Sequence, residues 1–289
     1  MTVDAMLAAE LGPPAGELLA LLGSPLRAAT LLTPLHGSTT PRRSFRIDLE
    51  DGRTLKLRRL RSVERAATYV GLIRDLAEPR LSRVLAHREA LTLEEWVDGD
   101  PLAARRVEPS HLAAAADLLA SLHASRPEAL RDLPSTLPTQ PVRATVEADL
   151  RLLLDAGAID AGTDTRLRAV VAREDPGKGK AGAIHGDFCP ENLVVDARGT
   201  LRAVDNEALH RGLVGFDLAT VAYRWPMTPS EWQDYLRAYG RRADPGPTLR
   251  HFAFWKIAAI AKSARVRVSR SARGVEKPLA RLRELAAER

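Results

Sequence analysis

Cysteine, aromatic residues and long apolar segments are scarce in this chain of 289 residues. The single cysteine, Cys189, excludes an intrachain disulfide and favours a reducing compartment, so we expect a cytoplasmic location. No apolar run reaches the roughly 18 residues that cross a bilayer, which argues against a membrane partner. The N-terminal MTVDAMLAAELG has no basic segment ahead of its apolar residues and is not typical of a secretory signal.

Aromatic residues make up 4% of the chain, while Lys and Arg number 43 against 37 Asp and Glu. A basic chain can bind nucleic acid. Here the basic residues are interspersed with acids, and so few aromatics leave no platform on which bases could stack. Nucleic-acid binding is therefore a rival interpretation rather than the favoured one. With 45% hydrophobic and 28% charged residues, the composition is that of a globular protein with a sizeable core.

The stretch 185–217, HGDFCPENLVVDARGTLRAVDNEALHRGLVGFD, is the most informative in the chain. Asp187 lies five residues before Asn192, Asp205 ends an apolar run, and Asp217 follows twelve residues later. Phosphoryl transfer uses such groups: an acid orients the attacking hydroxyl, and an amide and a carboxylate hold the metal ions. Apolar residues on either side of a turn at 196–199 predict two short strands. We therefore expect Asp187, Asn192 and Asp205 to converge at one end of a small sheet.

This segment resembles the catalytic core of the aminoglycoside phosphotransferase and choline kinase group, a branch of the protein-kinase-like fold. That group shows HGDxxxxN, an apolar strand, an Asp-x-Glu-like pair and a Gly-rich turn ending in Asp-Leu-Ala. The present chain has HGDFCPEN, VDNE and GLVGFDLA. The resemblance implies an α+β, bilobal protein-kinase-like fold. A small β-rich N-lobe, residues 1–97, would bind the nucleotide. A larger helical C-lobe, residues 98–289, would hold the catalytic loop, the metal site and the acceptor pocket.

The resemblance also implies an activity, in which the γ-phosphoryl group of ATP or GTP is transferred to a hydroxyl of a small-molecule acceptor with the help of Mg²⁺. It implies no protein partner. Asp187 would be the catalytic base or orienting group, and Asn192 and Asp205 would bind Mg²⁺ with Glu207 as an auxiliary ligand. Asp217 would brace the catalytic loop. The alternative is a nucleotide-binding regulatory pseudokinase without turnover, and the intact catalytic and metal residues argue against it.

Strand-like alternation extends over Leu31–Leu60, with a hairpin turn at Glu50–Gly52. It places Leu55 and Leu57 on one face and Lys56 and Arg58 on the other. The resemblance makes Lys56 the lysine that binds the nucleotide phosphates, and we favour this role over the alternative of an exposed strand lysine. Its acidic partner is expected on the helix predicted at Ser62–Ala77. Glu64 is a weak match for that partner, because it follows Lys56 after too few residues. Thr68 is the other residue at the expected position of the partner.

Two further segments are candidates for nucleotide contacts. His36–Thr40 contains Ser38 in a small polar turn whose backbone N–H groups could cover phosphates, although the same turn is common in any hairpin. Leu93–Leu102, LEEWVDGDPL, corresponds to the connection whose backbone contacts the nucleobase in the resembling group. Glu95 and Trp96 are therefore nucleotide-binding candidates, and packing within the connection is the alternative role for Trp96. His123, at the end of a predicted helix, is expected to be a buried structural residue.

The C-terminal part contains helical patterns at Thr248–Val268 and Val275–Ala287. From Arg250 to Arg289 there are eleven basic and three acidic residues. In the resembling enzymes such helices help to build the acceptor pocket, and a basic wall repels a polycationic aminoglycoside. A neutral or anionic hydroxyl compound, such as a sugar or a phosphorylated metabolite, fits better. The acids that could offset this charge are few, namely Glu231, Asp234 and Asp244. The alternative is that these basic residues face water.

Overall fold

The computed structural model describes residues 2–32, 43–104, 106–125, 142–270 and 274–288. Contacts within it separate two compact units. The first unit runs to Asp100 and also contains Val194–Glu207, and the second contains Pro101–Leu193 and the chain from Ala208 onward. The segment Val194–Glu207 thus belongs by its contacts to the strand-rich part of the chain, although it follows the second unit's first helices in sequence.

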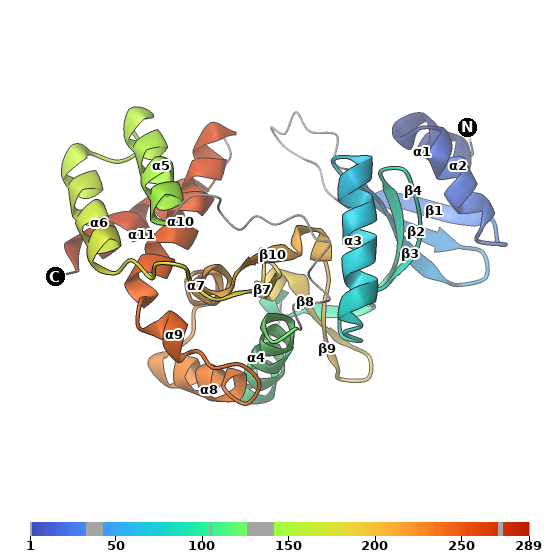
Figure 1. Ribbon diagram of the computed structural model, residues 1–289. Coiled ribbons are helices and arrows are strands. Elements are labelled where there is room, and N and C mark those ends of the chain that lie inside the picture. Colours follow the sequence, from blue (N-terminus) through green and yellow to red (C-terminus); the bar gives the residue numbers. More distant parts are fainter. Residues whose placement is uncertain (1, 33–42, 105, 126–141, 271–273, 289) are drawn as a thin grey trace. The chain divides into compact units, whose positions relative to one another are not determined.

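The first unit is built around an antiparallel sheet of strand order β1-β2-β3-β5-β4 (Figure 1). Its strands are β1 (Leu26–Leu31), β2 (Arg43–Leu49), β3 (Thr54–Arg59), β4 (Val84–Arg88) and β5 (Leu91–Glu95). The helices of this unit are α1 (Val3–Leu11), α2 (Pro13–Ala20) and α3 (Val63–Leu76). A smaller sheet has the order β6-β8-β9, made by Gly99–Pro101, Leu193–Asp196 and Leu201–Ala203.

The two faces of the larger sheet carry different side chains, as the alternation predicts. One face is apolar and packs against α1 and α2, burying Leu55 and Leu57 together with other sheet and helix residues. The opposite face carries Lys56 and Arg58 on β3, and Glu94 lies opposite Lys56 on β5. Helix α3 begins where the helix was predicted, and Ser62 caps it, because its side chain accepts a hydrogen bond from the Arg65 N–H. The sheet therefore presents a polar face on the side away from its main apolar core.

The second unit is mainly helical. Its larger elements are α4 (Pro109–His123), α5 (Val142–Asp155), α6 (Ala161–Arg173), α7 (Val214–Arg224), α8 (Pro229–Tyr239), α10 (Phe252–Ser269) and α11 (Glu276–Ala287). The shorter ones are β7 (Ala181–Ile184), β10 (His210–Leu213), α9 (Gly246–Leu249) and the 3₁₀ turns η1 (Leu102–Ala104) and η3 (Pro190–Asn192). The 3₁₀ turn η4 (Asn206–Ala208) straddles the limit of the units. Strands β7 and β10 pair in antiparallel fashion, and α5, α6, α10 and α11 share one apolar core.

Most predicted elements are present, and two boundaries were wrong. Strand structure begins at Leu26, before the alternation that starts at Leu31. The helix predicted across Thr248–Val268 is divided into α9 and α10. Between them the His251 Nδ1–H donates to the Glu174 carbonyl at 3.0 Å, a bond made with a distant part of the unit. Helical periodicity does not reveal such a bond. At the start of α8, Thr228 and Glu231 form a capping box.

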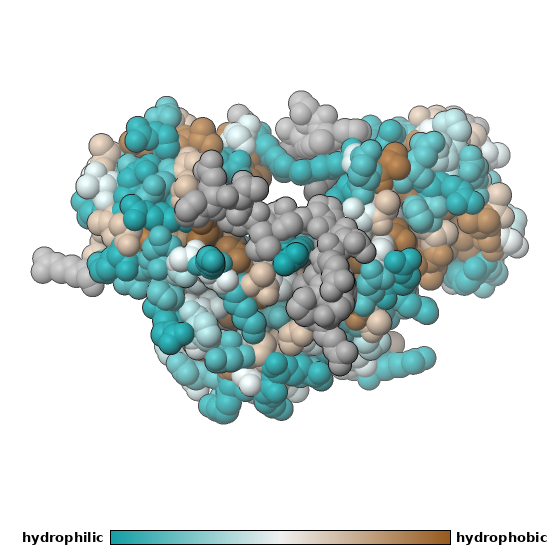
Figure 2. Space-filling model, in the orientation of Figure 1, coloured by the Kyte–Doolittle hydropathy of each residue, from teal (hydrophilic) through white to brown (hydrophobic). Residues whose placement is uncertain are grey.

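The surface agrees with this division into core and exterior. On the face in view in Figure 2, hydrophilic residues predominate on the described parts, and hydrophobic residues appear in separate patches. Among the described helices, none is long and apolar enough to cross a membrane.

Candidate active site

The catalytic loop predicted at His185–Asn192 follows directly after β7. Gly186 has φ +79°, a conformation that favours glycine, and an added Cβ would lie 3.0 Å from the Ala208 carbonyl oxygen. This glycine lets the chain turn sharply after the buried strand. Asp187 therefore leaves the core immediately, and its side chain is 49% exposed.

Asp217, at the start of α7, holds this loop from within the core. Its fully buried carboxylate accepts hydrogen bonds from the backbone N–H groups of His185 (2.6 Å) and Gly186 (2.9 Å). Although burial raises its pKa, the hydrogen bonds from His123 and the loop lower the pKa of Asp217 below its usual value. Asp217 stays ionised and braces the loop, as predicted.

His123 extends this brace to helix α8. Its Nε2 lies 3.3 Å from Asp217, and its Nδ1 lies 2.7 Å from the Tyr239 hydroxyl. With the proton on Nε2, the ring donates to the carboxylate and accepts from Tyr239 O–H. All three side chains are buried. His123 is thus a structural residue behind the catalytic loop, as expected from the sequence, and not a group open to a substrate.

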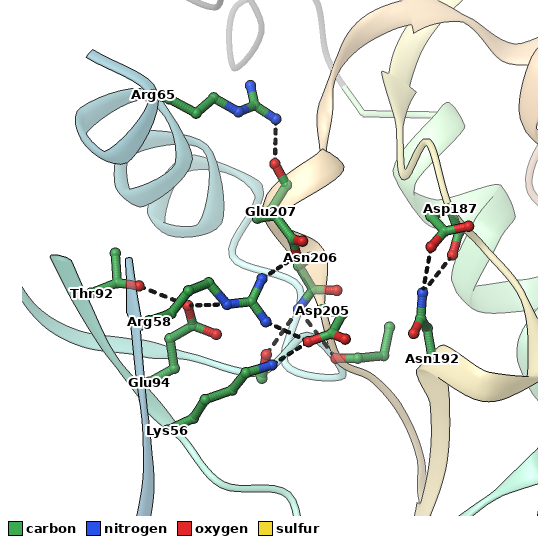
Figure 3. A network of polar contacts seen from close by, with 12 residues as sticks. Lys56, Arg58, Arg65, Thr92, Glu94, Asp187, Asn192, Asp205, Asn206 and Glu207 are labelled. Atoms are coloured by element: carbon green, nitrogen blue, oxygen red, sulfur yellow. Dashed lines mark hydrogen bonds and ion pairs between the residues drawn. The ribbon is translucent and has the colours of Figure 1, made fainter. Parts of the chain in front are cut away.

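Asp187 and Asn192 come together within the second unit (Figure 3). The Asn192 Nδ2 donates to the Asp187 backbone carbonyl (2.9 Å) and to Oδ2 (3.1 Å). The other carboxylate oxygen of Asp187 lies 3.3 Å from the Arg224 guanidinium. The amide holds the carboxylate in place while leaving it half exposed. The Asn192 amide oxygen, for its part, has no hydrogen-bond partner in the described part of the chain.

Cys189 lies next to this carboxylate, with its sulfur 4.0 Å from the Asp187 Oδ1. Burial and the neighbouring negative charge raise the pKa of the Cys189 thiol. The thiol therefore stays protonated and is unsuited to act as a nucleophile.

A second polar network lies in the first unit and joins β3 to the segment after β9 (Figure 3). Lys56 and Arg58 both pair with the Asp205 carboxylate, and Arg58 also pairs with Glu207. Asp205 has φ +57°, which is uncommon for a residue with a side chain. Burial by itself raises the pKa of Asp205. The charges of Arg58 and Lys56 and their hydrogen bonds outweigh this effect and lower the pKa to about 2. Three of the predicted site residues, Lys56, Asp205 and Glu207, are thus brought together.

A further acid in this network, Glu94, lies on β5, whereas an acidic residue on α3 was expected from the sequence. Glu94 is fully buried, accepts a hydrogen bond from the Thr92 hydroxyl at 2.8 Å, and lies 3.5 Å from the Arg58 Nε. On α3, Arg65 donates to the Glu207 backbone carbonyl. Glu64, the partner considered for Lys56, instead interacts with Ser62 at the helix start. Among the described residues, the carboxylate that pairs with Lys56 is Asp205.

Sequence reasoning missed Arg58, Glu94 and Arg224 as parts of these networks. The alternation did place Arg58 on the same face as Lys56, so a signal for it was available. The sequence signal for Glu94 was weaker, namely an acidic residue within the apolar run LTLEEW. Arg224 had no local signal, because its contacts with Asp187 and Glu191 bring together residues more than thirty positions apart.

The remaining nucleotide-binding candidates lie in different surroundings. Ser38 falls outside the described residues. The Glu95 carboxylate receives two hydrogen bonds of 2.8 Å from Arg202, which lower its pKa to about 2. Over the Trp96 ring lies the Arg46 guanidinium, 5.1 Å from the centroid. The side chains of Glu95 and Trp96 are thus held by neighbours in the first unit, and contacts of their backbone with a nucleobase stay a prediction.

A cavity of about 410 Å³ opens beside Gly186 and Asp187 in the second unit. Its other walls are formed by α7 and α10, with Phe216, Arg224 and Lys262 among the lining residues. The half-exposed Asp187 carboxylate is therefore next to a space that can take a small molecule. Among the described residues, no three or more His, Cys, Asp or Glu side chains gather as they would in a cluster of metal ligands.

Comparisons with known proteins agree with this arrangement. A family model described as "Phosphotransferase enzyme family" matches residues 31–254. The structure of macrolide 2′-phosphotransferase from Brachybacterium faecium is 20% identical, with 96% of this chain and 97% of that chain covered and a TM-score of 0.67. Choline kinase from Streptococcus pneumoniae is 13% identical, with coverage of 94% and 96% and a TM-score of 0.67.

A third structure, the GDP and kanamycin complex of APH(2")-IIia, is 12% identical, with coverage of 98% and 97% and a TM-score of 0.67. No curated protein sequence matches the chain. Because these likenesses extend over nearly the whole chain, they confirm the predicted α+β protein-kinase-like fold and the resemblance to the aminoglycoside phosphotransferase and choline kinase group.

Proposed function

Because the chain belongs to the phosphotransferase enzyme family, we propose that it transfers the γ-phosphoryl group of ATP or GTP to a hydroxyl of a small, sugar-like or other metabolite. The enzyme class predicted from the sequence, a phosphotransferase with an alcohol group as acceptor, is confirmed by the family match. The observation that carries the proposal is the half-exposed Asp187 carboxylate, which stands on a loop braced by Asp217 and faces a cavity.

Asp187 is proposed to orient the acceptor hydroxyl and to take its proton. A carboxylate within hydrogen-bond reach of the hydroxyl can do both. Asn192 fixes one carboxylate oxygen, and the Arg224 guanidinium lies 3.3 Å from the other. The acceptor oxygen then attacks the γ-phosphorus, the bond from that phosphorus to the β–γ bridging oxygen breaks, and the nucleoside diphosphate leaves.

Lys56 is proposed to bind the nucleotide phosphates. Its ammonium group is fixed by Asp205 and lies beside the Arg58 guanidinium in the same network. A lysine ammonium group binds phosphate oxygens as a point charge. The donor's identity rests on the fold group, of which one structural neighbour was solved with GDP.

The donor set suits Mg²⁺, which prefers carboxylate and amide oxygens. Asn192 and Asp205 are proposed as its ligands, with Glu207 as auxiliary. The Asn192 amide directs its nitrogen to Asp187 and keeps its oxygen available, and the Asp205 carboxylate is 45% exposed. When bound, the ion would neutralise charge on the phosphates.

The test is nucleotide hydrolysis in the absence of an acceptor, measured for the wild type, Asp187→Asn and Asp155→Asn. Replacing the carboxylate at 187 removes the proton acceptor, so turnover should fall by roughly 10²-fold while nucleotide binding persists. Asp155 is exposed at the end of α5 and serves as the matched control with unchanged turnover. Excess chelator should abolish turnover in all three proteins.

If the Asp187→Asn variant turned over as fast as the wild type, Asp187 would have no part in the reaction. Nucleotide binding without any hydrolysis by the wild type would favour the regulatory pseudokinase instead. A salt-dependent shift of nucleic acid in place of nucleotide binding would favour the nucleic-acid rival.

A further inference from the structure

The charged side chains that line the cavity beside Asp187 are mostly basic. Of the residues around it, Arg224, Lys262, Arg267 and Arg270 are cationic, and Asp187 is the acid. The last three of these basic residues lie along α10 and the residue that follows it. Their spacing, together with that of Ala259, Ser263 and Val266, is the one that brings residues to the same side of a helix. One side of α10 thus forms a basic wall of the cavity.

The described residues give the cations of this wall no acidic partner. Among the described residues, no carboxylate lies within ion-pair distance of Lys262, Arg267 or Arg270. Lys262 lies over the Phe216 ring, 5.5 Å from its centroid. Burial raises the pKa of Asp149 and the charge of Lys262 opposes this rise, but the two side chains are not within ion-pair distance. Arg267 donates to the backbone carbonyl and the hydroxyl of Ser263. These three residues are called the α10 cations below.

Basic residues on other sides of α10 are paired. Arg265 lies 2.6 Å from Asp149, and Lys256 lies 3.8 Å from Glu288. On α11, Arg281 contacts the same Glu288 at 3.7 Å. Within the described residues, the lack of counter-ions is therefore a property of the side that faces the cavity and not of the whole basic C-terminal region.

The acids that could offset the wall are engaged elsewhere. Glu231 caps α8 by accepting from the Thr228 N–H at 2.7 Å, and Asp234 pairs with Arg237 at 2.9 Å. Asp244 accepts from the Gly246 N–H at 2.8 Å. None of these three acids is among the residues that line the cavity. Asp187, the one carboxylate among the described lining residues, is already shared with Arg224.

From this arrangement we infer that the cavity takes a hydroxyl acceptor that carries an oxyanion group, and that the α10 cations bind that group. Several cations on a concave wall without counter-ions raise the positive potential there and attract an anion. Arginine guanidinium groups match a phosphate or a carboxylate through paired hydrogen bonds. A polycationic acceptor would be repelled by the same wall.

This inference rests on the proposed function and specifies its acceptor. With the oxyanion on the α10 cations, a hydroxyl of the same molecule lies toward Asp187. Its proton passes to the Asp187 carboxylate, the oxygen bonds to the γ-phosphorus, and the nucleoside diphosphate leaves with the bridging oxygen. The product carries the new phosphoryl group in addition to the oxyanion that positioned it.

The test is competitive retention by equilibrium dialysis with detection by mass spectrometry. An equimolar mixture of glucose 6-phosphate, gluconate, glucose and kanamycin represents the phosphate, carboxylate, uncharged and polycationic classes. The wild type should retain one or both oxyanion compounds at least about 10-fold more than glucose, and kanamycin least. Which of the two is retained distinguishes a phosphate from a carboxylate as the recognised group.

Two double variants separate the wall from general charge. Lys262→Met/Arg267→Met removes two of the α10 cations and should lose the preference for oxyanions. Lys256→Met/Arg281→Met removes the same charge from outside the cavity, where both residues pair with Glu288, and should keep it. The single variant Arg270→Met changes an exposed residue and provides a further check if the first double variant folds poorly.

Three results would overturn the inference: preferential retention of glucose or kanamycin by the wild type, no retention of either oxyanion, or equal retention by the two double variants. Nucleotide hydrolysis by the wild type without acceptor tells the two proposals apart. If it proceeds while oxyanions are not preferred, the acceptor class is wrong and the phosphotransferase stands.

Discussion

Charged side chains are arranged in opposite ways at two places, one in each unit. In the first unit, Lys56 and Arg58 meet Asp205 and Glu207, and the buried Glu94 stands next to Arg58. In the second unit, the α10 cations line a cavity without carboxylates at ion-pair distance among the described residues. The paired charges hold elements of the fold in place. The α10 cations do not stabilise the fold in this way. This pattern is expected of a surface whose counter-charge comes from a ligand.

The largest difference between the two regions should appear in stability. Arg58→Met removes a buried cation from three carboxylates, and the free energy of unfolding should fall by about 3–5 kcal/mol. Lys262→Met should change it by no more than about 0.5 kcal/mol, because no ion pair is lost. Urea unfolding followed by circular dichroism measures both values. The double variant Arg58→Met/Glu94→Gln should recover part of the loss. Equal stability changes in the two single variants would end the distinction.

The next effect concerns pH and the ion pair of Glu95 with Arg202. Hydrogen bonds from Arg202 lower the pKa of Glu95 from its usual 4.5 to about 2 in the folded protein. A lowered pKa stabilises the fold fully above pH 4.5, and the stabilisation is lost as the pH falls toward 2. With solvent screening it is worth about 2 kcal/mol. Glu95→Gln should therefore flatten the decline of stability over this range. Glu50→Gln, at an exposed turn, should leave it unchanged. The same decline in both variants would contradict the assignment.

The smallest effect contrasts a paired and an unpaired hydroxyl on one helix. Tyr235 and Tyr239 are both buried on α8, and of the two hydroxyls only that of Tyr239 has a hydrogen-bond partner among the described residues, namely His123. Tyr239→Phe should cost about 1 kcal/mol and lower the turnover number a few-fold, since His123 steadies Asp217. Tyr235→Phe should be neutral or stabilising, because it removes a buried hydroxyl that has no partner. Thermal unfolding and nucleotide hydrolysis measure the pair, and a greater loss in Tyr235→Phe would contradict the brace.

Local patterns made much of this molecule predictable from sequence. The spacing of Asp187 and Asn192 within one loop was enough to expect their contact, and the alternation of β3 was enough to place Lys56 away from the apolar core. Strand β1 was missed because its residues, LRAATL, are only partly buried and do not alternate cleanly.

Contacts between distant segments were beyond such patterns. The Lys56–Asp205 pair joins residues 149 positions apart, so nothing in the spacing around Lys56 pointed to it. The sequence did indicate that the C-terminal region is basic. Only the structure showed which basic residues line the cavity and which, such as Lys256 and Arg265, are paired elsewhere.

Asp187, on its braced loop, is proposed to take the proton of an acceptor hydroxyl in the cavity while that hydroxyl receives a phosphoryl group. The most direct measurement incubates the enzyme with γ-labelled nucleotide, Mg²⁺ and pools of hydroxy compounds sorted by charge. Mass spectrometry then detects an acceptor that has gained one phosphoryl group. Such a product should form in step with nucleoside diphosphate from the wild type and Asp155→Asn, and at most a trace should form from Asp187→Asn. Label recovered only as inorganic phosphate from every pool, or equal product from Asp187→Asn, would contradict this proposal.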